Sequence, residues 1–127
     1  MKEIISTTKA PAAIGPYNQG TSFEKLVFLS GQIPLIPETM EIIEGGINEQ
    51  TQQVMQNLKA VLDEANSSFE NVLKTTCYLS DMDNFVAFNE VYSQYFDVQN
   101  APARATVAVK TLPKNVLVEV DVIAFKN

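Results

Sequence analysis

Arg104, Glu119 and Asp121 are the side chains of this sequence best suited to chemistry on a small organic acid. They lie in two apolar segments, 104–109 and 116–125, which a short turn joins. In an antiparallel hairpin, strand alternation places Arg104 opposite Glu119 or Asp121, because a one-residue slip would force the guanidinium onto the apolar face. A guanidinium can grip a planar carboxylate with two hydrogen bonds, and a carboxylate whose pKa is raised by burial can orient or deprotonate water.

The same pair has a purely structural interpretation, and the pattern leaves both open. Cross-strand ion pairs at a protein surface are common and contribute about 0.2–1 kcal/mol. Two features favour function. Pro102 and Ala103 restrict the approach to Arg104, and the surrounding face is otherwise apolar.

The residues that are missing exclude several function classes. The chain has no His, which excludes an imidazole base, a Ser-His triad and a His-ligated metal. Its one Cys, Cys77, forms neither an internal disulfide nor a multi-thiolate site, and we interpret it as a core residue. The net charge is −6 with scattered basic residues, so we expect no nucleic acid and no anionic membrane as partner. The first residues lack the apolar run of a signal peptide, so we expect a cytoplasmic protein.

The elements that must position these residues form one domain, residues 1–127, of the α+β class. Helices are expected at 48–65 and 82–96 from the 3.6-residue period, with Asn48 as the first N-cap, Asn66 as its stop, and Ser80 or Asp81 before the second helix. The aromatic stripe of the second helix is interpreted as core. Strands are expected at 3–6, 20–23, 25–30, 41–44, 72–79, 104–109 and 116–125. This order predicts a mostly antiparallel mixed sheet with two helices on one face.

The other face of that sheet carries more apolar residues than a solvated face needs. Leu26 and Phe28 alternate with Val27 and Leu29, so one of these pairs must lie away from the helices. Further candidates for this surplus are Leu73, Leu79, Leu117 and Ile123. We expect a homo-oligomer, although the loop at 10–16 could instead cover the face.

Four separated motifs resemble the RidA/YjgF family of reactive-intermediate (enamine/imine) deaminases. They are PARATV at 102–107 followed by LP at 112–113 and VE at 118–119, AAIGPYNQG at 12–20, SGQIP at 30–34, and FNEVY at 88–92. The resemblance spans nearly the whole chain, with the motifs in the family's order.

The resemblance implies a chorismate-mutase-like fold, a homotrimer whose sheets face inward, clefts between subunits, and no cofactor or metal. The implied activity is hydrolysis of 2-aminoacrylate, 2-aminocrotonate and their imines to 2-keto acids and ammonia. Carried over by position, Arg104 holds the substrate carboxylate and Glu119 positions the attacking water. The remaining cleft residues implied by the resemblance are Tyr17, Ser30, Gly31, Asn89 and Thr106, the last through nearby backbone groups.

One departure from the family pattern lies beside the proposed arginine. Many members carry Cys where this chain has Thr106, so a mechanism that needs that thiol is lost here. The other cleft candidates also have plain structural interpretations: Tyr17 could pack under its loop, Ser30 and Gly31 could end a strand, and Asn89 could be a solvated helix residue.

Two further hypotheses stay open beside the enzyme. A regulatory module could bind a small carboxylate in the same cleft and act through a partner protein, since a fold does not fix a function. Cleavage of RNA is disfavoured by the charge and the missing His.

Overall fold

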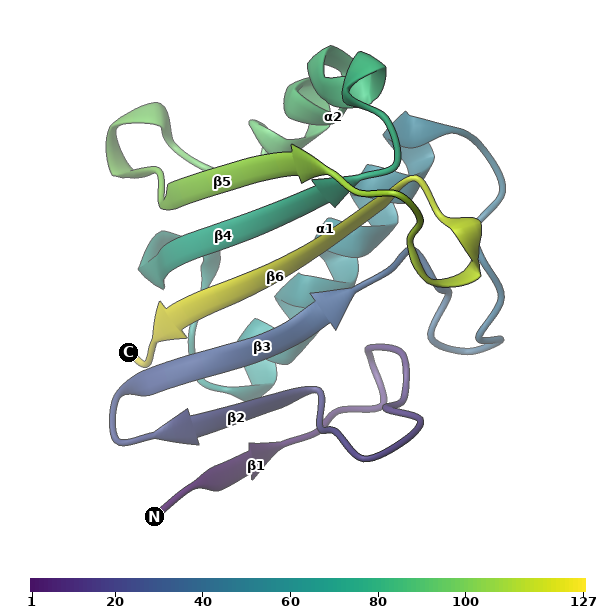
Figure 1. Ribbon diagram of the computed structural model, residues 1–127. Helices are drawn as coiled ribbons and strands as arrows, with labels where there is room; N and C mark the ends of the chain where they lie inside the picture. The colour runs from purple at the N-terminus through teal and green to yellow at the C-terminus, as the bar shows by residue number, and fades with distance from the viewer.

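The computed structural model describes all residues, 1–127, and shows a six-stranded mixed sheet with both α-helices on one face (Figure 1). The strands are β1 (Glu3–Ile5), β2 (Gly20–Phe23), β3 (Leu26–Gln32), β4 (Val72–Leu79), β5 (Ala103–Ala108) and β6 (Val118–Phe125). The helices are α1 (Ile47–Glu64) and α2 (Phe85–Tyr92), and the strand order is β1-β2-β3-β6-β4-β5. The predicted α+β class is confirmed. Neither helix is both long and apolar enough to cross a membrane.

The core lies between the sheet and α1. Strand β6 alternates as the sequence predicts, with Val118, Val120, Val122 and Ala124 buried against the helices. The apolar stripe of α1 supplies the opposing surface, and Val54, Leu58, Val61 and Leu62 are fully buried. The two-residue period of the strand and the 3.6-residue period of the helix therefore place apolar side chains in one shared core.

The start of α1 differs from the prediction. Its N-cap is Gly46, and Glu49 Oε1 accepts a hydrogen bond of 2.8 Å from the Gly46 N–H. The prediction of Asn48 is wrong because Glu49, three residues after the cap, satisfies an amide there and the helix begins earlier. The predicted stop is confirmed, since Asn66 has a left-handed φ of 59° just beyond the helix.

The second helix is shorter than the predicted 82–96. Asp81 accepts a hydrogen bond of 2.8 Å from the Asp83 N–H and starts a 3₁₀ turn, Met82–Asn84, before α2 begins at Phe85. Tyr95 and Phe96 follow the helix, yet the Phe96 ring centroid lies 4.8 Å from that of Tyr92. The aromatic stripe is core, as predicted, although its last members are in a turn.

Two smaller predictions are wrong. Residues 41–44 form no strand, since only an isolated bridge joins Leu35 and Ile42. Leu79 does not belong to the surplus on the open face, because it is fully buried among the core residues.

The predicted hairpin of 104–109 with 116–125 is also wrong. Strand β5 pairs in parallel with β4, and β6 lies between β3 and β4. The clean alternation of β6 suits a central strand, whereas β5 is exposed along most of its length and lies at the sheet edge.

This pairing moves Arg104 away from the carboxylates. Arg104 is the partner of Thr75, whose side chain is buried beneath the helices, so Arg104 lies on the helix face. Glu119 is the partner of Tyr78 on the opposite face. The sequence prediction placed both on one face, and in a single chain they lie on opposite faces.

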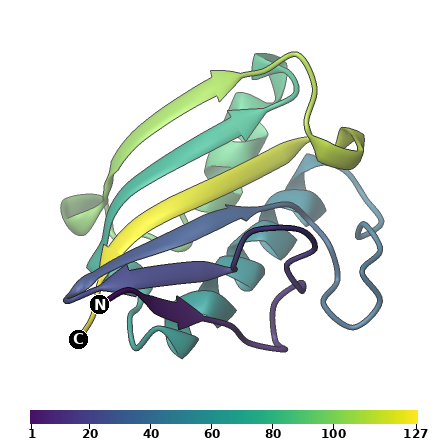
Figure 2. The same cartoon turned by 60° about the horizontal axis from the view of Figure 1, so that its bottom comes forward.

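The face without helices, which we call the open face, carries the predicted apolar surplus. Leu26 and Phe28 are each 43% exposed, and Val107 and Phe125 are also exposed there. No helix covers this face in either view (Figures 1 and 2). An apolar area of this kind on a small domain is typical of an interface.

The Pro-rich loop before β2 is held by one buried amide. Gln19 Nε2 donates to the carbonyls of Thr7 (3.0 Å), Ala10 (3.3 Å) and Pro11 (2.8 Å), and its Oε1 accepts from the Thr7 N–H (2.6 Å). The Gln19 side chain thus supplies hydrogen bonds to loop backbone groups that have no partner in a strand.

We predict that Gln19→Leu lowers the free energy of unfolding by about 2–4 kcal/mol, because it leaves several backbone groups without a partner. Urea unfolding at fixed protein concentration measures this loss. The matched control is Gln52→Leu on the exposed side of α1, which should change stability by less than about 0.5 kcal/mol. Equal effects of the two substitutions would contradict the role of Gln19.

Candidate functional site

The side chains suited to chemistry form two groups on opposite faces of the sheet. The Arg104 group contains Arg104, Asn89, Tyr92 and Phe85, at the junction of β5 and α2. The Glu119 group contains Glu119, Asp121, Tyr78 and Gly31, on the open face of β3, β4 and β6.

In the Arg104 group, helix α2 holds the guanidinium. Asn89 Oδ1 accepts a hydrogen bond of 2.6 Å from Arg104 Nη1. The guanidinium carbon lies 4.8 Å from the ring centroid of Tyr92 and 5.5 Å from that of Phe85. Cation–π contacts and one strong hydrogen bond therefore fix a side chain that is exposed at a sheet edge.

Arg104 has no carboxylate partner within its own chain. The two ion pairs of the structure join Lys59 to Asp63 and Lys126 to Glu3. The structural interpretation of Arg104 as half of a cross-strand salt bridge is therefore wrong for the single chain. Arg104 lines an open pocket of about 450 Å³, and its N–H groups other than the one bound to Asn89 make no hydrogen bond within the chain, so they are available to an acidic ligand.

In the Glu119 group, the carboxylate is packed over Gly31. A Cβ added at Gly31 would overlap Glu119 Oε2 and lie 3.0 Å from its Cδ. The register of β3 and β6 shifts between Leu29 and Gln32, and this irregularity brings Gly31 under the carboxylate. A side chain at position 31 would therefore displace the Glu119 carboxylate from its present position.

Burial raises the pKa of Glu119 above its ordinary value, and the nearby charge of Asp121 raises it further. Asp121 in turn accepts a hydrogen bond of 3.3 Å from the Tyr78 hydroxyl. A half-buried carboxyl with a raised pKa can take up and return a proton nearer to neutral pH than an exposed one.

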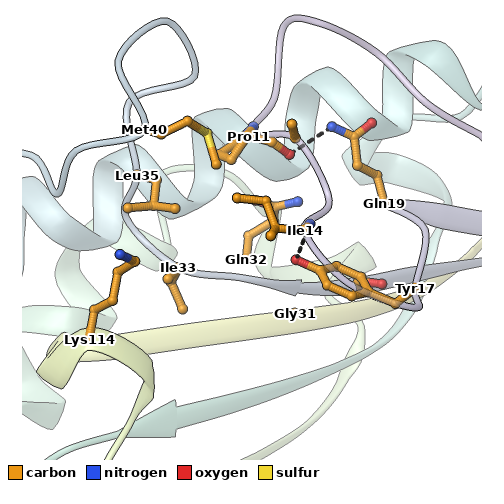
Figure 3. Close-up of a pocket in the computed structure, with 12 residues that line it drawn as sticks. Pro11, Ile14, Tyr17, Gln19, Gly31, Gln32, Ile33, Leu35, Met40 and Lys114 are labelled. Atoms are coloured by element: carbon orange, nitrogen blue, oxygen red, sulfur yellow. Dashed lines mark hydrogen bonds between the residues drawn. The ribbon is translucent and has the colours of Figure 1, made fainter.

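Next to Gly31 lies a pocket of about 380 Å³, drawn in Figure 3. Tyr17, Ser30 and Gly31 line it, so the structure brings these three predicted residues together. The Ser30 hydroxyl donates to the Asn18 carbonyl at 2.5 Å. The Tyr17 ring is about half exposed, and its hydroxyl accepts from the Ile14 N–H at 3.4 Å.

Thr106 lies on the helix face of β5, two residues after Arg104. It is the strand partner of Cys77, and its Oγ1 is buried without a hydrogen-bond partner. Because β5 is an edge strand, backbone groups on its outer side also have no strand partner. The predicted contribution of Thr106 through backbone groups is compatible with this position.

Cys77 is buried in the core, as predicted. Burial raises the pKa of its thiol to about 11, so the thiol is protonated at neutral pH and a poor nucleophile. The chain also brings together no group of three His, Cys, Asp or Glu residues that could hold a metal ion.

The sequence interpretation missed Tyr92 as a neighbour of Arg104, although a signal was present. Asn89 and Tyr92 belong to one motif and are three residues apart, a spacing that places both on one side of a helix. The apolar wall of the Figure 3 pocket, formed by Ile33, Leu35 and Met40, was also missed, because these residues come from a loop with no periodic pattern.

Comparison with known proteins shows similarity over almost the whole chain. The family model described as "Endoribonuclease L-PSP" matches residues 7–126. A RutC family protein of Pyrococcus abyssi is 50% identical over 126 residues, covering 99% of this chain and 98% of that protein. A protein of Lactococcus lactis named "Putative regulator AldR" is 52% identical, covering 96% of each. The mouse protein named 2-iminobutanoate/2-iminopropanoate deaminase is 43% identical, covering 100% of this chain and 93% of that protein.

Solved structures share the fold. A putative endoribonuclease of Thermotoga maritima has a TM-score of 0.96 at 47% identity, covering 100% of this chain and 99% of that one. A structure of E. coli TdcF with bound serine has a TM-score of 0.91 at 41% identity, covering 98% and 99%. The expected fold class is therefore confirmed by close structural relatives as well as by the strand order.

We predict that Asp121→Asn lowers the pKa of Glu119, because it removes the negative charge that disfavours ionisation of Glu119. Carbon-13 NMR of the Glu119 side-chain carboxyl, followed through a pH titration, measures this shift. Asp63→Asn, a change in an exposed ion pair on α1, is the control and should leave the titration of Glu119 unchanged.

The raised pKa of Glu119 also determines how its contribution to the free energy of unfolding changes with pH. A carboxyl whose pKa is raised by folding contributes stability at low pH, and this contribution is lost as pH rises through the raised pKa. An unchanged or higher pKa of Glu119 in Asp121→Asn would contradict the assigned cause.

Proposed function

Since the chain belongs to the endoribonuclease L-PSP family, which is the YjgF/RidA family, we propose that it is a reactive-intermediate deaminase. Its substrates in this proposal are 2-enamine and 2-imine acids such as 2-aminoacrylate and 2-aminocrotonate, and its products are 2-keto acids and ammonia. The name of the mouse relative, a 2-iminobutanoate/2-iminopropanoate deaminase, supports this reaction.

The observation that carries the proposal is the preorganised, unneutralised guanidinium of Arg104. Asn89 and the aromatic rings of α2 hold it, and Arg104 lines an open pocket with most of its N–H donors unpaired. The paired N–H donors of a guanidinium match the two oxygens of the carboxylate that every proposed substrate carries, whereas a lysine would offer only a point charge.

The proposed chemistry needs little more than orientation. An enamine substrate first becomes the imine as C3 gains a proton and the nitrogen loses one. The imine carbon is electrophilic, so water adds to it, the C–N bond then breaks, and ammonia leaves as the keto group forms. Glu119 orients the water, accepts its proton and returns a proton to the departing nitrogen, and its raised pKa favours this exchange. The reaction consumes no oxidant and uses no metal or cofactor.

The two halves of the proposed site come from different copies of the chain. Arg104 and Glu119 lie on opposite faces of one sheet, and the apolar open face offers a contact surface. We propose a homotrimer with the open faces directed inward, in which Arg104 of one subunit meets Glu119 of the next. Homo-oligomers with cyclic symmetry commonly use one such repeated contact.

The other cleft residues have indirect roles in this proposal. Asn89 acts through Arg104, and Gly31 provides the space that Glu119 occupies. Tyr17 closes the cleft beside Ser30, and the outer backbone of β5 near Thr106 completes it.

The physiological role in the proposal is removal of intermediates that pyridoxal-phosphate dehydratases release, before they damage other pyridoxal-phosphate enzymes. We place this role in the cytoplasm. Neither nucleic acid nor a membrane is a partner in it, and the net charge of −6 supports that choice.

A regulatory module that binds a small carboxylate is the second candidate. Two observations favour it: a relative at 52% identity bears the name of a putative regulator, and a structural relative was solved with bound serine. The Arg104 group suits such binding equally well, so only turnover separates the two candidates.

We predict that Arg104→Ala reduces kcat/KM for imine hydrolysis by at least about 100-fold, because it removes the charged partner of the substrate carboxylate. The assay generates 2-aminoacrylate with a serine dehydratase and follows release of the keto acid. Arg104→Lys should recover only a small part of the activity, since lysine lacks the paired N–H donors of the guanidinium. Lys59→Ala, on the exposed face of α1, is the charge-matched control and should keep full activity.

Each outcome decides a separate point. A wild-type protein that does not accelerate keto-acid release would contradict the enzyme, and carboxylate binding without turnover would favour the regulatory module. Full activity in Arg104→Ala would contradict the role of Arg104 alone.

A further inference from the structure

Tyr92 is held in place by a buried pair of hydroxyl groups. Its OH lies 2.8 Å from Thr75 Oγ1, and both residues are buried. A buried hydroxyl without a partner is costly, so this contact strongly favours one ring orientation. The ring also packs between Phe88 and Phe96, with centroid distances of 5.4 Å and 4.8 Å.

Thr75 connects this ring to the strand that carries Arg104. Thr75 and Arg104 are direct partners in the parallel pairing of β4 with β5. The hydroxyl pair therefore ties α2 to the strand beside Arg104 and brings the ring face to 4.8 Å from the guanidinium carbon. Asn89, one helical turn before Tyr92, binds Nη1 of the same guanidinium.

These contacts fix the guanidinium carbon over the Tyr92 ring and bind one N–H of Nη1. A long side chain on an exposed edge strand otherwise loses rotamer freedom when it grips a ligand, which weakens binding. One N–H of Nη1 donates to Asn89, whereas Nε and Nη2 make no hydrogen bond within the chain and remain available as two parallel donors for a carboxylate.

We propose that Tyr92 is a positioning residue for carboxylate binding: its ring, held by Thr75, supports the guanidinium so that Arg104 presents its free N–H donors to the ligand. This inference rests on the proposed function of Arg104 and assigns to Tyr92 no contact with the substrate. The Tyr92 hydroxyl is engaged with Thr75 in the core, so it is not a proton donor to the reaction.

The test uses the intact protein and 2-oxobutanoate as the probe, with its Kd measured by calorimetry beside kcat and KM for the imine. Tyr92→Met fills a similar volume without a ring face, and we expect Kd and KM to rise together by about 5- to 20-fold, with kcat within about 2-fold. Tyr92→Phe keeps the ring and should rescue binding to within about 3-fold of wild type. In an Arg104→Ala background, Tyr92→Met should produce no further change in Kd.

A merely structural role of Tyr92 gives a different pattern. In that case Tyr92→Met lowers the free energy of unfolding or the fraction of active protein, measured by unfolding and sedimentation, without raising the Kd for 2-oxobutanoate. Wild-type Kd in folded Tyr92→Met, or equal losses in Tyr92→Met and Tyr92→Phe, would overturn the proposal. Absence of 2-oxobutanoate binding by the wild-type protein would overturn it as well.

If Tyr92→Met does not fold, the wild-type protein decides the matter by NMR. A ring face near the guanidinium shifts the Arg104 side-chain proton signals upfield, and random-coil positions would overturn the proposal. Binding of 2-oxobutanoate without turnover would contradict the proposed deaminase while leaving the role of Tyr92 intact. Turnover with wild-type KM in Tyr92→Met would contradict only the role of Tyr92.

Discussion

The parallel pairing of β4 with β5 is the constraint on which the rest of the site depends. It places Arg104 beside Thr75 at the edge of the sheet, within reach of α2. There the guanidinium meets Asn89 and the ring of Tyr92 instead of a carboxylate of its own chain. A cation that is held in place but not neutralised is what recognition of an acidic substrate requires.

The same pairing separates Arg104 from Glu119 by placing them on opposite faces. Glu119 is supported by its own features, the absence of a side chain at Gly31 and the burial that raises its pKa. The open face beside it is apolar and uncovered by helices. In the proposed assembly, a second copy of the chain covers this surface and brings its Arg104 to the carboxylate, so the proposal explains the apolar face and the divided site together.

The spacing of apolar residues along the sequence predicted those helices and strands whose buried residues recur at a regular interval. The alternation of β6, the stripe of α1 and the left-handed stop at Asn66 are all visible in the sequence and present in the structure. Strand order was not predictable in this way, because it depends on contacts between distant segments. The sequence suggested that the last two strands pair as a hairpin. Strand β6, with its alternating apolar residues, instead lies between β3 and β4, and β5 lies at the edge of the sheet. The motifs singled out Arg104 and Glu119, whose roles stay predictions, and the hairpin that the sequence predicted between them does not exist.

The most direct measurement of the central claim mixes two inactive variants. Arg104→Ala and Glu119→Gln subunits are unfolded together in equal amounts, refolded, and assayed for imine hydrolysis beside each variant refolded alone. If each site takes Arg104 from one subunit and Glu119 from another, random mixing restores roughly a quarter of the wild-type activity, because that share of sites has both residues intact. Activity in the mixture no higher than in the separate variants, with oligomers confirmed by sedimentation, would contradict a site shared between subunits.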